Sequence, residues 1–424
     1  MRKAIYLFAA LIVVVLSCNK EEHYINKLSD VSEGRVVIRD LETATMWAEK
    51  SLSLLGPQTK NGASIRSIES HEVILRPGTK TGFSSSDTLL YVFNFEDSSG
   101  FSIIAANESE EPIIGIAEKG HYTKRHPSGV NGFDLYLAGV MERLSSERGP
   151  GQPFRWYEDV MVGDSVDRNV GVKWGQEDIY GYYCPNYIAG CAPTAIAQIM
   201  AYHQYPSSFI ASVNMGGDYL AGESVSLNWT GIKTHIDLHT DSLSCNQYHK
   251  QISALLREIG YAANTNYTSP NSSSTSTNNV PGAFEHFGYT TSSPVLVNSN
   301  SISTLTSCIK SFGPVCMRGS RVQNDTLIGH AWVADGYKDF AYYHNGYSWA
   351  TNGDEPFMFE HTLIRESHVL HINWGWDGDC NGFFNFNSYD IDNAVIYDDT
   401  HNNSGRNYDT NVKMIVVYPV NPYL

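Results

Sequence analysis

The sequence predicts an α+β protein with two domains that follow a short export segment. Three observations support this prediction. The chain has 424 residues, more than a single hydrophobic core usually spans. Both halves combine stretches in which apolar residues recur at helical spacing with stretches that alternate as strands do. Charged residues make up only 17% of the chain while glycine and tyrosine are plentiful, a composition that favours a β-rich exported protein.

The first 18 residues predict an export signal. Arg2 and Lys3 give a positive start, and the apolar run that follows (4–16) has 13 residues, too few to span a bilayer. The run leads into Val-Leu-Ser-Cys, which resembles the bacterial lipoprotein box and implies that Cys18 becomes a lipidated first residue. An ordinary secretory peptide cut near Ser17 is the alternative. Lipidation would tether the chain to the outer membrane or cell surface without a spanning helix, and release after processing stays open.

Residues 24–153 predict the smaller α+β domain. Apolar spacing predicts one helix that starts near Leu41 and a second helix centred on Leu137. Between them, three runs separated by polar turns predict an antiparallel meander, namely TLLYVFNF, GFSIIAA and PIIGIAE. His121 and His126 lie in a polar loop, so no residue of this half is a candidate for catalysis.

Residues 160–424 predict the larger domain. The stretch CAPTAIAQIMAYH predicts a helix that begins near Ala192 or Pro193, because proline is favoured in the first helical turn. The stretch QISALLREIGYA predicts another helix, and the polar residues 264–279 predict a long loop. After Pro281 the chain is expected to be rich in strands, which include PVCMRG, IGHAWVADGY, FAYYHNGY, VLHINWGW, GFFNFN and KMIVVYPV.

Charge and cysteine spacing exclude several classes of function. The formal charge of -16 leaves no basic stripe for phosphates, so nucleic acid is not an expected partner. The seven cysteines include no Cys-x-x-Cys pair, which argues against a zinc ribbon or a thioredoxin motif. Apart from Cys18 and Cys191 they are interpreted as buried small hydrophobes, with one or two disulfides left open. No metal or organic cofactor is expected.

Cys191 and His330 form the candidate catalytic pair. A thiol at a helix start loses its proton more easily, because the unpaired N–H groups and the helix dipole favour an anion there. Such a nucleophile needs an imidazole, and His330 lies 139 residues downstream, within the interval of about 130–150 typical of papain-like enzymes. His203 lies about three turns along the helix and is too distant. Position alone leaves open that Cys191 is an inert packed cysteine and His330 a core histidine.

Several segments resemble the streptopain family of cysteine peptidases. The three strongest are GCAPTAIAQIMAYHQYP, GHAWVADGY and HINWGWDGDCNGFF. VGVKWGQEDIYGYYCP resembles the start of the mature enzymes, and YVFNFEDSSGFSIIAANESEEPIIGIAEKG resembles their pro-domain. Together these segments cover most of residues 30–390. The resemblance implies a papain-like catalytic domain, in which a helical part carries Cys191 and an antiparallel β part carries His330, preceded by a pro-domain.

The resemblance also implies a role for individual residues. Cys191 matches the nucleophile, and His330 matches its base and acid. Gln176 matches the glutamine whose amide stabilises the oxyanion, a role in which the backbone N–H of Cys191 would join it. Asn373 and Trp374 match an Asn-Trp pair beside the histidine, in which one residue orients the imidazole and the other shields it from water.

Some positions depart from the family pattern. DIYG follows WGQ where relatives usually have a Pro-Tyr-Asn-like turn, and Pro193 replaces a small residue. Neither change removes a reactive group, but both leave the loop geometry and the substrate preference undetermined. Trp376 is interpreted as part of the cleft wall, with a plain core role as the alternative.

The sequence therefore predicts an exported, lipid-tethered cysteine endopeptidase that is made as a zymogen. It would hydrolyse proteins or peptides through a Cys-His dyad and a thioester acyl-enzyme. Its own pro-domain (24–153) would be the intramolecular inhibitor, removed by cleavage between Gly149 and Val172. Two alternatives stay open, a non-peptidase acyl-transfer enzyme such as an amidase or transglutaminase, and an inactive surface-binding relative.

Overall fold

The structure is a computed structural model of the 424-residue chain. It describes residues 37–56, 66–76, 87–108, 110–123, 132–145, 157, 159–168, 170–235, 246–270, 272–323, 326–348, 357–386 and 412–418. The predicted export signal with Cys18 lies outside these ranges, as do His126, Cys245 and Gly149. None of the helices within the ranges has the length and hydrophobicity needed to cross a bilayer. Among the described residues no group of three or more His, Cys, Asp or Glu side chains is arranged to hold a metal ion.

The N-terminal domain combines two helices with an antiparallel meander. Its elements are α2 (Leu41–Leu55), β1 (Ile68–Leu75), β2 (Thr88–Phe95), β3 (Phe101–Ala105), β4 (Ile113–Ala117) and α3 (Gly132–Ser145). Both helices and the strands β2 to β4 lie where the sequence predicts them. Strand β1 was not predicted, because it is an edge strand that buries little and its sequence, IESHEVIL, lacks clean alternation.

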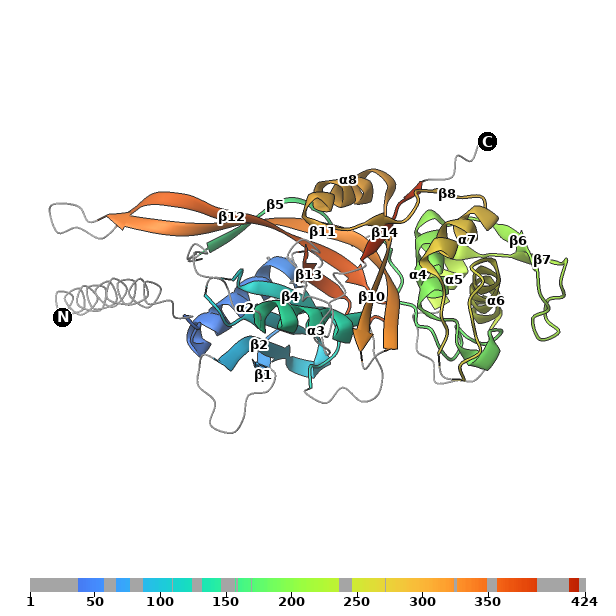
Figure 1. Cartoon of the computed structure of the whole chain (residues 1–424), viewed down its shortest axis with the longest axis horizontal. Helices are drawn as coiled ribbons and strands as arrows, with labels where there is room; N and C mark the ends of the chain where they lie inside the picture. Colours follow the sequence, from blue (N-terminus) through green and yellow to red (C-terminus); the bar gives the residue numbers. More distant parts are fainter. Residues whose placement is uncertain are drawn as a thin grey trace, which may run out of the picture.

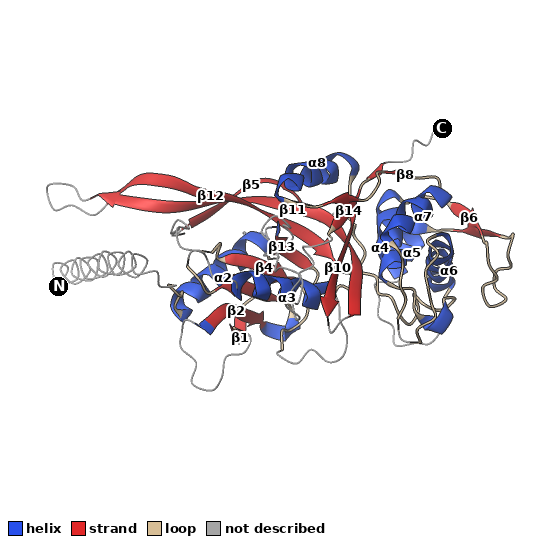
Figure 2. Ribbon diagram, viewed as in Figure 1, coloured by secondary structure: helices blue, strands red, loops and turns tan. Residues whose placement is uncertain are grey.

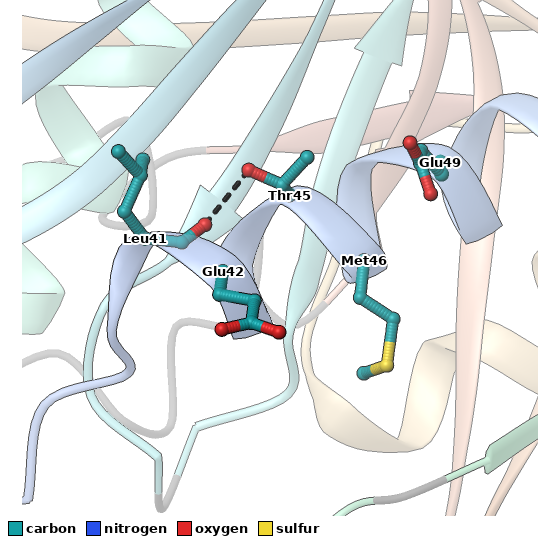
Figure 3. Close-up of a pocket in the computed structure, with 5 residues that line it drawn as sticks. All are labelled: Leu41, Glu42, Thr45, Met46 and Glu49. Atoms are coloured by element: carbon teal, nitrogen blue, oxygen red, sulfur yellow. Dashed lines mark hydrogen bonds between the residues drawn. The ribbon is translucent and has the colours of Figure 1, made fainter.

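Helix α2 shows how local signals set an element. Asp40 caps it by accepting the backbone N–H of Thr43 at 2.7 Å. Trp47 lies at the centre of its buried face, whereas Leu41, which the apolar spacing places on that face, is 42% exposed. Figure 3 shows a surface hollow on the outer side of α2, and it contains none of the predicted site residues. The hollow is lined by Leu41, Glu42, Thr45, Met46 and Glu49.

The C-terminal domain begins with a helical lobe. Its helices are α4 (Cys191–His203), α5 (Trp229–His235), α6 (Gln247–Ala262) and α7 (Val280–His286), and a small hairpin of β6 (Ser208–Ile210) and β7 (Ser224–Ser226) joins them. In Figure 1 these helices gather at one end of the molecule. A further helix, α8 (Ile302–Phe312), lies outside the lobe. Helices α5, α7 and α8 were not predicted, because α5 and α7 have only seven residues each and the sequence of α8 is rich in Ser and Thr, which are weak helix formers.

The rest of the domain is mainly antiparallel strand. The strands are β5 (Asp159–Val166), β8 (Thr290–Thr291), β9 (Val295–Leu296), β10 (Val315–Gln323), β11 (Thr326–Ser348), β12 (Phe357–Asn373), β13 (Gly382–Asn385), β14 (Lys413–Ile415) and β15 (Val417–Tyr418). Short 3₁₀ turns are η2 (Glu96–Ser98), η3 (Pro185–Tyr187), η4 (Thr277–Asn279) and η5 (Ser299–Ser301). Two predicted strands, IGHAWVADGY and FAYYHNGY, form the single strand β11, which pairs with β12 as a long ribbon (Figure 1).

One sheet runs through both domains. It has 11 strands, in the order β1-β2-β3-β4-β13-β12-β11-β10-β14-β9, with β5 paired to β11. The seam between the domains is the antiparallel pair β4 and β13, in which Ala117 faces Gly382 and Gly115 faces Phe384 (Figure 2). The N-terminal domain therefore extends the sheet that carries His330.

Alternation along β11 sends neighbouring side chains to opposite faces of this sheet. Ala331 and Val333 belong to the core that includes helix α4. Trp332 and Ala334 belong to a different core, which includes helix α3 of the N-terminal domain. His330 lies on the same face as Trp332, so its ring is turned toward the N-terminal domain.

Candidate active site

Cys191 is the first residue of helix α4, one position before the predicted start. Gly190 precedes it with φ of 92°, a conformation that side chains rarely adopt. A Cβ at Gly190 would also lie 1.9 Å from Oγ of Ser273, so the polar loop 264–279 packs directly against this turn. Cys191 itself is half-buried, while residues 192–201 of the helix are all buried. The buried helix fixes the thiol at the end where its N–H groups are unpaired.

His330 on β11 faces the same site and is only 3% exposed. Its Nε2 lies 2.9 Å from the backbone oxygen of Trp374. A carbonyl oxygen only accepts, so Nε2 carries the proton and donates it. In the neutral imidazole this leaves Nδ1 as the nitrogen that can accept a proton.

Three indole rings surround this imidazole. Trp332 and Trp376 lie nearly parallel to it, each with its ring centroid 6.3 Å from that of His330. Trp374 is tilted by 36° at 6.4 Å and is completely buried. The three rings keep water from most of the imidazole. Trp376, interpreted from the sequence as cleft wall or core, is part of this aromatic shell.

The imidazole of His330 acts on the thiol of Cys191, and its effect is the largest of those that oppose burial. Burial by itself would raise the pKa of this thiol. The hydrogen bond to His330, the charges of His330 and Arg318 and the backbone N–H of Ala331 outweigh burial, and together they lower the pKa of Cys191 to about 7. At neutral pH a large fraction of Cys191 is therefore a thiolate.

Gln176 is brought back to the start of α4 by the backbone. The N–H of Ala189, two residues before the helix, donates to the backbone oxygen of Gln176 at 2.7 Å. This bond holds Gln176 beside the start of the helix. Its side chain is 7% exposed, and its Nε2 donates to the backbone oxygen of Gly375 at 3.2 Å. An amide nitrogen has two hydrogens, so the second remains for another acceptor.

Asn373 lies next to the site, but its amide is hydrogen-bonded to backbone groups and not to the imidazole. Its Nδ2 donates to the backbone oxygen of Val172 at 2.8 Å, and its Oδ1 accepts the N–H of Gly375 at 3.1 Å. The polar partner of His330 is instead the backbone carbonyl of Trp374, one residue further along. Asn373 ties together the two chain segments that flank the site, because both ends of its amide are occupied by backbone groups.

Helix α3 of the N-terminal domain begins directly against the imidazole. A Cβ at Gly132, its first residue, would lie 2.3 Å from Cδ2 of His330 and 2.5 Å from Cε3 of Trp374. The next turn packs Tyr136 against Phe384, with ring centroids 5.0 Å apart. The N-terminal domain thus occupies the face of the sheet from which His330 projects.

Sequence reasoning missed two charged residues near the site. Arg318 lies on β10 and its charge acts on Cys191, and Glu118 interacts with the buried His371. Arg318 could have been recognised from the sequence, because it is a lone arginine in the apolar run PVCMRG. Glu118 left none, because a glutamate at the end of a strand is common on protein surfaces.

The described cysteines other than Cys191 are free thiols, at positions 184, 308, 316 and 380. Burial raises the pKa of Cys184, Cys316 and Cys380 to about 12, so each of them stays protonated at neutral pH. Cys191 therefore differs in kind from the other cysteines whose surroundings are described.

Two family models match the chain. Residues 174–384 match the Peptidase C10 family, and residues 29–138 match the model described as Spi protease inhibitor. The first range contains every predicted site residue except Cys18. The second range contains β1 to β4 and the start of α3.

Curated proteins also resemble this chain over most of its length. Streptopain of Streptococcus pyogenes serotype M28 is 22% identical over 361 residues, which cover 77% of this chain and 80% of streptopain. Thiol protease/hemagglutinin PrtT of Porphyromonas gingivalis is 22% identical over 330 residues, covering 71% of this chain and 34% of that protein.

Among solved structures, a prointerpain A fragment of Prevotella intermedia matches with a TM-score of 0.51 at 19% identity, covering 82% of this chain and 99% of the fragment. This match confirms the predicted α+β fold, a papain-like catalytic domain preceded by a smaller domain. The two family models and the curated relatives identify the chain as a streptopain-like cysteine peptidase that carries a pro-domain.

Proposed function

We propose that this cysteine peptidase is an exported zymogen that cleaves peptide bonds with Cys191 and His330 as its dyad. The observation that carries the proposal is that Cys191 begins a buried helix and that the imidazole of His330 favours the thiolate there. The lowered pKa of Cys191, near 7, provides the nucleophile at neutral pH without any metal. The hydrogen bond from His330 to Trp374 supports the tautomer that can accept the thiol proton.

In the first step the proton of Cys191 passes to Nδ1 of His330, and the thiolate attacks the peptide carbonyl. The imidazolium then gives this proton to the departing amine as the C–N bond breaks, which leaves a thioester. In the second step His330 removes a proton from water, and the hydroxide attacks the thioester. The C–S bond breaks and its electron pair returns to sulfur.

The tetrahedral intermediates of both steps carry a negative oxygen that needs donors. The backbone N–H of Cys191, at the helix start, would be one donor. The amide of Gln176 would be the other, since the bond from Ala189 holds this residue beside the helix and one amide hydrogen is free. Trp374 would supply the carbonyl that orients the imidazole and the indole that shields it.

The pro-domain would be the intramolecular inhibitor. Gly132 and the helix it begins stand against His330 and Trp374, where they would exclude substrate. Activation would require a cut between Gly149 and Val172. Strand β5 lies inside this segment and pairs with β11, so the N-terminal sequence of the active enzyme will tell whether β5 stays with it.

The export signal supports attachment to the outer membrane or cell surface through a lipid on Cys18. Cys18→Ser removes the acylated thiol, so we expect the full-length protein to move from the detergent phase to the aqueous phase in Triton X-114 partitioning. Equal partitioning of both proteins into the aqueous phase would favour an ordinary secretory peptide.

The proposed dyad is tested by Cys191→Ala. Because the nucleophile is lost, we expect the variant to persist as the full-length precursor and to leave casein intact, while the wild type converts itself and clears a casein gel. Cys308→Ala is the matched control, since it removes a thiol from helix α8 outside the site. Casein clearing by the Cys191→Ala protein would contradict the proposal.

A further inference from the structure

Arg318 on β10 is buried without a full set of partners. Its side chain is 8% exposed, and Nη2 donates to the backbone oxygen of Thr275 at 2.8 Å. Its Nε and Nη1 are buried and have no hydrogen-bond partner among the described residues. A buried guanidinium in this state is costly unless an anion compensates its charge.

The register of the sheet places this charge beside the active site. Arg318 pairs with Ala331 and Cys316 pairs with Val333, so both β10 side chains lie on the face that packs against α4. Ala331 belongs to the core against which Cys191 packs, and its backbone N–H favours the thiolate. Thr275 belongs to the loop that packs on Gly190, which ties the guanidinium to the turn before the thiol.

Few groups are available as the counter-ion. Within the described part of the chain, no carboxylate forms an ion pair with Arg318. The charge of Arg318 acts on the thiols of Cys191 and Cys316. Burial raises the pKa of Cys316 to about 12, so that thiol stays neutral. Cys191 is the group left to supply a negative charge.

We propose that Arg318 is a positioning residue whose guanidinium is a second counter-ion, beside His330, for the thiolate of Cys191. This inference rests on the proposed role of Cys191 as nucleophile. When the thioester forms, Arg318 loses its anion, and it regains that anion when the C–S bond breaks. The same charge therefore favours both the nucleophile of the first step and the leaving group of the second.

The test measures how fast iodoacetamide alkylates Cys191 in the processed enzyme between pH 5 and 10, read by mass spectrometry of the peptide that contains it. The titratable and charged groups that face this thiol are His330 on β11 and Arg318 and Cys316 on β10. We expect Arg318→Met and Arg318→Gln to move the midpoint upward by about one pH unit, since a nearby opposite charge shifts a pKa by about that much or more. Below the midpoint, alkylation would then be about tenfold slower.

Arg318→Lys keeps the charge and should restore most of the wild-type profile. Arg257→Met is the matched control, because that arginine acts on Cys184 rather than on Cys191. Having two neutral variants and a lysine variant, each checked by thermal unfolding, separates loss of charge from loss of fold.

An unchanged alkylation profile in a folded neutral variant would overturn the inference. If that variant instead lost only the hydrolysis of peptides with an acidic residue next to the cleaved bond, Arg318 would bind substrate and the inference would also fail. A wild-type Cys191 that does not react at any pH would refute the proposed nucleophile itself. The two failures are therefore distinguishable.

Discussion

At the scale of single residues, Gly132 decides how closely the pro-domain reaches the imidazole. Any side chain there would overlap His330 and Trp374, both of which are almost fully buried and cannot move aside easily. Glycine at the first position of α3 lets backbone stand where a side chain would not fit. The closeness of the pro-domain to His330 thus depends on one missing Cβ.

We expect Gly132→Val to push α3 away from His330 in the unprocessed chain. Overpacking of this kind costs about 1–3 kcal/mol, which corresponds to roughly a fivefold to hundredfold larger population of the open form. Iodoacetamide should accordingly alkylate Cys191 of the full-length variant faster than that of the wild type. Ala138→Ser on the same helix is the control, and an equal rate in Gly132→Val and wild type would contradict this account of occlusion.

At the scale of elements, strand β4 is fixed to the catalytic domain at both ends. Before the strand, the buried carboxylate of Glu111 accepts the hydroxyl of Ser367 at 2.6 Å and also contacts Asn385 and Arg365. After the strand, Glu118 contacts Arg168 and lies 3.8 Å from Nε2 of His371. Backbone pairing of β4 with β13 sets the direction of the seam, and the two glutamates set its register.

We expect Glu111→Gln to weaken this seam by about 1.5–3 kcal/mol, the usual range for hydrogen bonds to a charged group. Arg365 is partly exposed, so water can compensate some of the lost ion pair. The full-length variant should convert to its processed form faster than the wild type in a time course followed by gel. Glu110→Gln is the matched control, because Glu110 pairs with Arg143 inside the pro-domain. Equal conversion rates for the two variants would argue against an anchor at Glu111.

At the scale of the whole molecule, the zymogen is held by a buried charge cluster as well as by its shared sheet. His371 is 3% exposed, and its Nδ1 lies 2.5 Å from Oδ1 of Asp335. Burial opposes its charge, but Asp335 and Glu118 outweigh burial and raise its pKa from 6.5 to about 9. For Glu118, burial is outweighed by His371 and Arg168, which lower its pKa from 4.5 to about 2. Of the two carboxylates that act on His371, Asp335 therefore belongs to the C-terminal domain and Glu118 to the N-terminal domain.

These shifts predict a pH dependence. A raised pKa means that the contribution of His371 is full below about pH 6.5 and is lost as the pH rises through about 9. A lowered pKa means that the contribution of Glu118 is full above about pH 4.5 and is lost as the pH falls through about 2. In the Cys191→Ala chain, which cannot process itself, we expect the thermal midpoint to fall between pH 6.5 and 9. The fall should be smaller when Glu118→Gln is added, and an identical fall in both proteins would contradict the role of this pair.

Individual elements show how much of the fold can be predicted from the sequence. Strand β2 has the bounds that its letters predict, and helix α4 begins one residue before its predicted start, because apolar spacing and turn residues are local signals. Helices α5, α7 and α8 were not predicted, since tertiary packing overrides weak propensity. The fusion of two predicted strands into β11 was also missed, because the charged residues Lys338 and Asp339 between them resemble a turn, whereas both pair in regular register with β12.

The sequence by itself determined the thiol at a helix start, the histidine on a distant strand and the family resemblance that joins them, because residue type and spacing carry that information. Only the tertiary structure decided that the carbonyl of Trp374, rather than the amide of Asn373, bonds to the imidazole, that Gly132 faces His330, and that Arg318 lies beside Cys191. These contacts involve backbone atoms or residues far apart in the chain. Neither kind of contact leaves a pattern in the order of residues, so these contacts are determined only when the sheet is assembled.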